Sequence, residues 1–186
     1  DEVAKKMSSD NHVLAMDLLG HGDSSWPESD YRFADRSADI RNFVTKTDLN
    51  EITAVAHSTG AVALTMNVAA NPSRFKKLVL LEPMMIVDEK FQRMVSDRGN
   101  RARTTWSDQA ELKDLLGKHE VTSKWHPTVI DDVVEHETFV NKDGRVDMKW
   151  SSNTLSWGER EDDYLDLAPI LESISMPILF IVGGNR

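Results

Sequence analysis

The sequence contains no cysteine among its 186 residues. This absence excludes a disulfide framework, a thiolate nucleophile and a zinc site with cysteine ligands. Long hydrophobic runs are also missing: residues 177–184 form one of the longest apolar stretches and are far too few to span a bilayer. Basic residues do not predominate, since the formal net charge is −9, which argues against nucleic acid or an anionic membrane as a partner.

The remaining composition is that of an ordinary globular protein. Apolar residues make up 40% and charged residues 28% of the chain, which suits one domain, with or without a modest insertion. The absence of cysteine fits either redox compartment, so the localisation stays open, with the cytoplasm as the favoured expectation. We expect no cofactor and no metal, and a small molecule as the substrate or ligand.

Four short apolar runs predict buried strands, at residues 13–18, 52–56, 78–81 and 178–182. Each run is nearly continuous rather than alternating, as in a parallel sheet that has helices on both faces. Residues 33–44 have apolar side chains at helical spacing, and residues 60–70 are rich in alanine and valine, which predicts a helix that is buried nearly all round. This alternation of strands and helices predicts an α/β fold.

Residues 84–166 form a charged region that lacks strong strand patterns and contains four of the five tryptophans, which could line an apolar pocket. Helical patterns recur there at residues 89–95, 109–116 and 128–136. Because a strand pattern returns only afterwards, we interpret the region as a mostly helical cap inserted into one core. The predicted domains are a core of residues 1–83 and 167–186 and a cap of residues 84–166, with a separate helical domain as the alternative.

A serine stands where the strand predicted at 52–56 meets the helix predicted at 60–70. The local sequence is Ala56-His57-Ser58-Thr59-Gly60. A sharp strand-to-helix turn would expose the serine hydroxyl and place the unpaired N–H groups of a helix N-terminus behind it. Such a turn favours small residues two positions before and after the serine. The sequence therefore predicts a strained nucleophile elbow at Ser58.

A second motif lies upstream, at residues 16–27, which read MDLLGHGDSSWP. An aspartate at the end of a predicted strand, followed by a loop with two glycines and placed before a serine elbow, resembles the α/β-hydrolase-fold superfamily. The resemblance covers residues 13–83 and 177–184, and the middle of the chain resembles the variable cap of these enzymes.

The resemblance implies roles for individual residues. Ser58 would be the nucleophile, and the backbone N–H of Thr59 would be one donor to the oxyanion. His57 is expected to pack and to form hydrogen bonds rather than act as the base. Three polar residues of the second motif, Asp17, His21 and Ser24, are expected to organise their loop.

Two parts of such a hydrolase are not found in the sequence. The family's base histidine would follow residue 186, and its second oxyanion donor would precede residue 1. We therefore expect an internal piece of a hydrolase that is inactive alone, with no histidine bonded to Ser58. In this fold another strand lies between the strands predicted at 13–18 and 52–56, so a gap about 9–10 Å wide is expected between them.

The acid of a catalytic triad has two candidate places. Most members of the family carry it a few residues after a glycine that corresponds to Gly183, where this chain has Arg186. The other place is the end of the preceding strand, where Glu82 stands 24 residues after Ser58. Glu82 could instead only cap the end of its strand.

The leading interpretation is a serine hydrolase that acts on an ester or a related acyl compound through an acyl-enzyme. The serine argues against dehalogenase or epoxide-hydrolase chemistry, which uses a carboxylate nucleophile. C–C hydrolases, lactonases, thioesterases and perhydrolases share this serine and remain open. A non-catalytic ligand-binding protein or receptor on the same fold is the alternative from another class.

Overall fold

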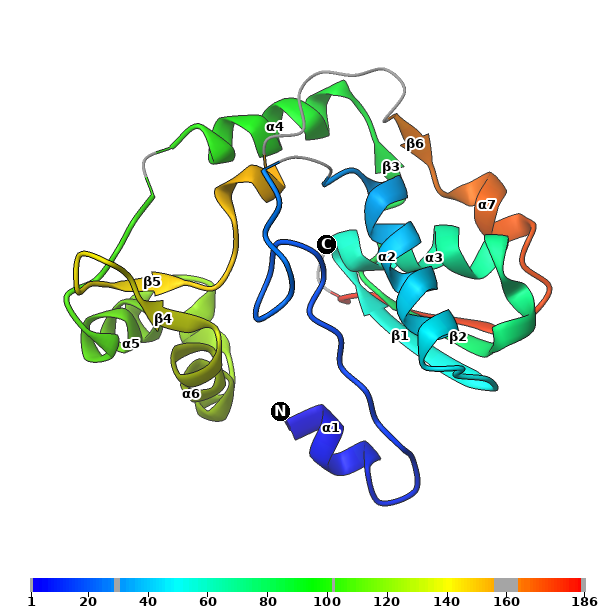
Figure 1. The fold of residues 1–186 in the computed structure, drawn as a ribbon, viewed down its shortest axis with the longest axis horizontal. Coiled ribbons are helices and arrows are strands. Elements are labelled where there is room, and N and C mark those ends of the chain that lie inside the picture. Colours follow the sequence, from blue (N-terminus) through cyan, green and yellow to red (C-terminus); the bar gives the residue numbers. More distant parts are fainter. Residues whose placement is uncertain (1, 29–30, 102, 156–163, 185–186) are drawn as a thin grey trace. The chain divides into compact units, whose positions relative to one another are not determined.

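The computed structural model describes residues 2–28, 31–101, 103–155 and 164–184 (Figure 1). They divide into two compact units. The hairpin unit comprises residues 1–26 and 101–152, and the sheet unit comprises residues 27–100 and 153–186. These boundaries differ from those of the predicted core and cap, which remain a prediction. Within the described ranges, no helix is long and apolar enough to cross a membrane.

The sheet unit is built on three parallel strands, β1 (Ile52–His57), β2 (Phe75–Leu81) and β7 (Ile178–Ile181), in the order β1-β2-β7. The strands predicted at 52–56, 78–81 and 178–182 are therefore confirmed, and so is the α/β class. Since β2 lies between the other two, the carboxyl ends of β1 and β7 flank the carboxyl end of β2.

Helix α3 (Ser58–Ala70) packs against β1 and β2, and α2 (Phe33–Lys46) packs against α3 (Figure 1). The side chains from Ala61 to Thr65 are all buried, as predicted for a helix that is covered nearly all round. Leu78 and Leu80 of β2 are fully buried and form the centre of this core. The short helix α7 (Ala168–Glu172) also contacts α3.

The other face of this sheet exposes apolar side chains. Val55, Leu179 and Ile181 are 58%, 56% and 47% exposed, and the strand register places them on the face opposite Leu78 and Leu80. Of the two helical layers predicted, the described part of the sheet unit thus shows one, the layer formed by α2 and α3.

Three further elements of the sheet unit follow β2 in the chain. Strand β3 (Ile86–Val87) pairs with β6 (Leu165–Asp166), and α4 (Glu89–Gly99) begins where the Asp88 carboxylate accepts the N–H of Phe91 at 2.8 Å. This helix confirms the pattern read at residues 89–95.

The hairpin unit packs two helices against a β-hairpin. Its elements are α1 (Glu2–Met7), α5 (Gln109–Lys118), α6 (Pro127–His136), β4 (Thr138–Val140) and β5 (Val146–Met148). Leu112, Ile130, Val134 and Val146 form its buried core. Both helices were predicted, whereas the hairpin was not, because strands of three residues are too short to show a repeating pattern.

The strand predicted at residues 13–18 is wrong. The structure describes this segment, assigns it no strand, and leaves Leu14 about half exposed. An apolar run becomes a strand only where a neighbouring strand pairs with its N–H and C=O groups. Among the described strands, the only partner of β1 is β2. The gap expected between residues 13–18 and β1 remains a prediction.

Candidate active site

Ser58 occupies a sharp turn between a strand and a helix. His57 ends β1 with extended backbone angles (φ −121°, ψ 140°), and Ser58 begins α3 with φ 51°. A positive φ is uncommon for a residue with a side chain and marks local strain. The strained strand-to-helix turn predicted at Ser58 is therefore present, whereas its role as a nucleophile elbow remains a prediction. That its hydroxyl faces the cap remains a prediction.

His57 is the one histidine of the sheet unit, and no described hydrogen bond joins it to the Ser58 hydroxyl. The other five histidines belong to the hairpin unit, so the expectation that none of them reaches Ser58 remains a prediction. His57 is exposed and, by strand alternation, lies on the same sheet face as Val55.

The N-terminus of α3 supplies a donor for negative charge. Thr59 is the second residue of the helix, and the first four N–H groups of an α-helix have no acceptor within it. The helix dipole adds a partial positive charge at the same end. The arrangement can therefore stabilise an oxyanion that forms beside Ser58.

The small residues of the elbow do not serve equal purposes. Ala56 pairs with Leu80 in the sheet. A Cβ added to Gly60, in contrast, would meet nothing within 4 Å. The described residues therefore leave room for a larger side chain at position 60, although a tight turn was expected to require a small one.

We expect Gly60→Ala to leave the fold intact and to raise the free energy of unfolding by up to about 1 kcal/mol, because alanine favours the helical conformation over glycine. Denaturant unfolding measures this change. A loss of stability would show that position 60 needs glycine for a reason other than local space.

Glu82 directly follows β2, the strand that pairs with β1. Its φ is 41°, its backbone N–H donates to the carbonyl of Ile181 at 2.8 Å, and its carboxylate Oε1 accepts the N–H of Gly183. Only four described residues other than glycine have a positive φ, and Ser58 and Glu82 are two of them. The other proposed position for the acid, residue 186, lies outside the described residues.

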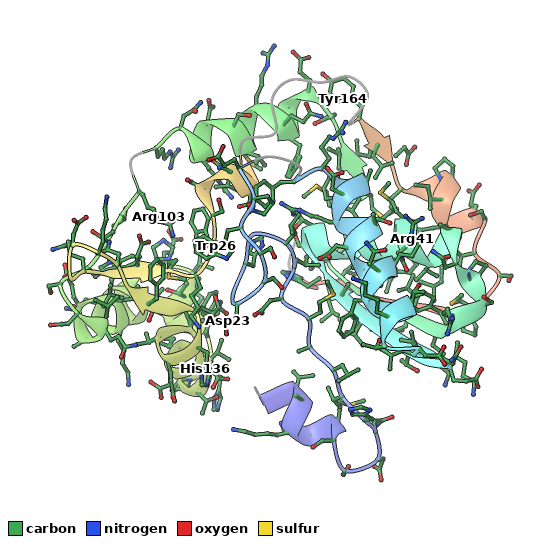
Figure 2. All side chains as sticks on the ribbon, viewed as in Figure 1. Asp23, Trp26, Arg41, Arg103, His136 and Tyr164 are labelled. Atoms are coloured by element: carbon green, nitrogen blue, oxygen red, sulfur yellow. The ribbon has the colours of Figure 1, made fainter. Side chains whose placement is uncertain are left out.

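The glycine-rich loop of the second motif, which carries the labelled Asp23 in Figure 2, is organised by Asp17, as expected. The Asp17 carboxylate accepts the N–H of Asp23 at 3.0 Å, and the Ser24 hydroxyl donates to the Asp17 carbonyl at 2.7 Å. His21 Nδ1 lies 3.2 Å from the Leu19 carbonyl. These contacts give the three polar residues a structural role within the loop.

The same loop is bound to a distant segment of the hairpin unit. The N–H of Gly22 donates to the Lys149 carbonyl at 2.7 Å, the N–H of Ser151 donates to the Gly20 carbonyl at 2.8 Å, and Lys149 Nζ lies 2.9 Å from Asp23 Oδ1. Next to Lys149, the ring of Trp150 lies beneath the Arg103 guanidinium at 4.9 Å. The pairing of the glycine-rich loop with residues 149–151 was not predicted from the sequence, because no local pattern signals a contact across more than a hundred residues.

A pH-sensitive group, Glu137, lies in the hairpin unit. The residue as a whole is exposed, yet partial burial of its carboxyl and then the negative charge of Asp17 raise the pKa of the Glu137 carboxyl. A carboxyl whose pKa is higher in the folded state binds protons more readily when folded. Its contribution to stability is therefore lost as pH rises from the unfolded pKa, about 4.3, through the folded pKa.

We expect Glu137→Gln to remove this loss. Thermal unfolding between pH 4 and pH 7 should show a smaller decrease in stability with rising pH for the variant than for the wild type. The effect should be small because the side chain is accessible. Glu135→Gln, at an exposed position of α6 two residues away, is the matched control. Identical pH profiles for Glu137→Gln and the wild type would contradict the prediction.

Comparison with known proteins gives concordant matches. A sequence model described as the alpha/beta hydrolase fold matches residues 2–123. The chain is similar to a probable alcohol acetyltransferase of Saccharomyces cerevisiae, with 26% identity over 194 residues that cover 95% of this chain and 55% of the yeast protein. The chain spans between 23% and 55% of the length of the curated relatives it matches.

Solved structures with the same fold include an alpha/beta hydrolase from Novosphingobium aromaticivorans, with a TM-score of 0.77, 18% identity, and coverage of 96% of this chain and 65% of that one. The crystal structure of E-2-(acetamidomethylene)succinate hydrolase is also similar, with a TM-score of 0.74 and 21% identity over 88% of this chain and 60% of that one. At these identities the likeness concerns the fold.

Proposed function

The chain belongs to the α/β-hydrolase-fold family, and we propose that it is a serine hydrolase acting on an ester or a related acyl compound, with Ser58 as the nucleophile. The observation that carries the proposal is the strained backbone of Ser58 at the junction of β1 and α3. A hydroxyl raised on such a turn, beside the free N–H groups of a helix, meets two geometric needs of acyl transfer.

In the proposed reaction, Ser58 Oγ attacks the carbonyl carbon of the substrate and loses its proton to a base. The carbonyl oxygen becomes an oxyanion that accepts the N–H of Thr59. Collapse of this intermediate breaks the ester C–O bond, and the proton passes to the leaving alcohol. Water then attacks the acyl-enzyme by the same steps and releases the acid.

Glu82 is proposed as the acid that orients the base. Its carboxylate accepts the N–H of Gly183, and Glu82 directly follows β2, the strand adjacent to β1. The end of the strand next to that which precedes the nucleophile is a place from which an acid can act on a base lying between the two. We further propose a small-molecule substrate, with neither nucleic acid nor a membrane as partner.

A second candidate function is acyl transfer to an alcohol. The similarity to the yeast probable alcohol acetyltransferase over 95% of this chain favours it. The chemistry would share the acyl-enzyme on Ser58, and an alcohol would replace water in the second step. The ratio of ester to free acid formed in the presence of ethanol separates the two functions.

A fluorophosphonate probe tests the proposal on protein produced from the complete natural reading frame. Stoichiometric labelling of the wild type at Ser58, absent from Ser58→Ala, is the expected result. If the folded wild type is not labelled, the proposed hydrolase is wrong and a ligand-binding protein on the same fold becomes the better explanation.

A further inference from the structure

A side chain takes the place of a main-chain acceptor where β2 and β7 end. Leu81 pairs with Ile181, and the N–H of Glu82 donates to the Ile181 carbonyl at 2.8 Å. In a regular parallel ladder, the next bond would run from the N–H of Gly183 to the main-chain carbonyl of Glu82. In this structure, the N–H of Gly183 donates to the Glu82 carboxylate instead.

The backbone conformation of Glu82 explains why its carboxylate replaces its carbonyl as the acceptor. Its φ of 41° turns the chain out of the strand, so its carbonyl leaves the ladder while its side chain remains beside β7. The N–H of Gly183 is thereby satisfied by a charged acceptor, and such bonds are stronger and more directional than neutral ones. The Glu82 backbone is thus tied to Ile181 of β7, and its carboxylate is tied to Gly183, two residues further on.

The two glycines after β7 have different surroundings. A Cβ added at Gly183 would lie 3.0 Å from Glu82 Oε1, whereas a Cβ added at Gly184 would meet nothing within 4 Å. Position 183 therefore approaches the carboxylate closely, and its neighbour provides a matched control.

We propose that Gly183 is a positioning residue, whose backbone N–H orients the Glu82 carboxylate for its task as the acid of the hydrolase. This inference rests on the proposed function, in which Glu82 orients the base. The alternative is that the bond only joins the ends of two strands. That structural role would need an acceptor at position 82 but not a negative charge.

Four variants distinguish the positioning role from the purely structural one. The measurement is turnover of p-nitrophenyl acetate by protein from the complete reading frame. Glu82→Gln keeps an oxygen acceptor but loses the charge, and kcat should fall by on the order of 10²–10⁴-fold. Gly183→Pro removes the N–H, and Gly183→Ala crowds the carboxylate; each should lower kcat by about 10- to 100-fold with little change in KM. Gly184→Ala should match the wild type.

Combining Gly183→Pro with Glu82→Gln tests whether the two residues act together. Because Gly183 is proposed to act through the charge of Glu82, the double variant should be no slower than Glu82→Gln alone. Independent, multiplicative losses would overturn the proposal. So would wild-type kcat in a folded Gly183→Pro or Gly183→Ala variant.

The hydrogen bond can be tested apart from turnover. In NMR spectra, the amide proton of Gly183 should move upfield in Glu82→Ala relative to the wild type, and an unchanged shift would overturn the proposed contact. Absence of Ser58-dependent turnover in the wild type would overturn the proposed function and the positioning role, whereas the amide shift would still report the contact. The two failures are therefore distinguishable.

Discussion

Replacing Ser58 with alanine is expected to lower kcat/KM for a short nitrophenyl ester by on the order of 10⁶-fold. The substitution removes the only atom that can form the proposed acyl-enzyme, and the remaining members of the site cannot replace it. Protein from the complete natural reading frame should be used for this measurement. Residual turnover within tenfold of the wild type would show that another group is the nucleophile.

Substitutions at Ser58 should also change the stability of the protein, and here glycine and alanine should differ. Ser58 has a φ of 51°, and a residue with a side chain held in this region costs about 1–3 kcal/mol. Glycine adopts the conformation freely, whereas alanine carries the same penalty as serine. We therefore expect Ser58→Gly to be more stable than Ser58→Ala by about 1 kcal/mol, although both are inactive.

Denaturant unfolding of the two Ser58 variants measures that difference directly. If Ser58→Gly were no more stable than Ser58→Ala, the positive φ at the elbow would not be a source of strain. The pair matters for function because strain concentrated at a nucleophile indicates that the surrounding fold holds the side chain in place.

Local patterns in the sequence were sufficient to predict the three-stranded sheet and helix α3 of the sheet unit. The runs that became β1, β2 and β7 are continuous and apolar, as predicted for sheet strands, and the Ala-rich run after Ser58 became the buried helix α3. The small residues around Ser58 located the elbow. These features depend on neighbouring residues, so periodicity alone could identify them.

Contacts between distant segments could not be predicted in the same way. The bond from Gly183 to Glu82 spans 101 residues, and the bond from Gly22 to Lys149 depends on where two separate loops meet. Residues 13–18 have the composition of a strand, but pairing is a property of a partner strand and not of the run itself. The sequence therefore located the candidate nucleophile more securely than the groups that hold the site in shape.

Gly22→Ala is expected to disrupt the glycine-rich loop and to lower the stability of the hairpin unit by about 2–4 kcal/mol. Gly22 has a φ of 52°, and a Cβ at this position would overlap the carboxylate of Asp17. The same carboxylate accepts the N–H of Asp23, so it cannot move aside without losing a bond. Two penalties therefore fall on one substitution: the positive φ and the overlap.

Gly144→Ala separates the two penalties. Gly144 lies in the hairpin turn of the same unit with a φ of 73°, but a Cβ there would meet nothing within 4 Å. Only the backbone penalty applies, and we expect a loss of about 1 kcal/mol. The excess loss in Gly22→Ala then measures the overlap with Asp17.

Amide hydrogen exchange locates the damage. In Gly22→Ala the N–H of residue 22, which donates to Lys149, and that of Ser151, which donates to Gly20, should lose protection, whereas amides of α3 in the sheet unit should not. In a double-mutant cycle, Asp17→Ala should remove part of the cost of Gly22→Ala, because the overlapping carboxylate is gone. Equal losses for Gly22→Ala and Gly144→Ala would contradict the packed loop, since only a loop that holds Asp17 against residue 22 makes their costs differ.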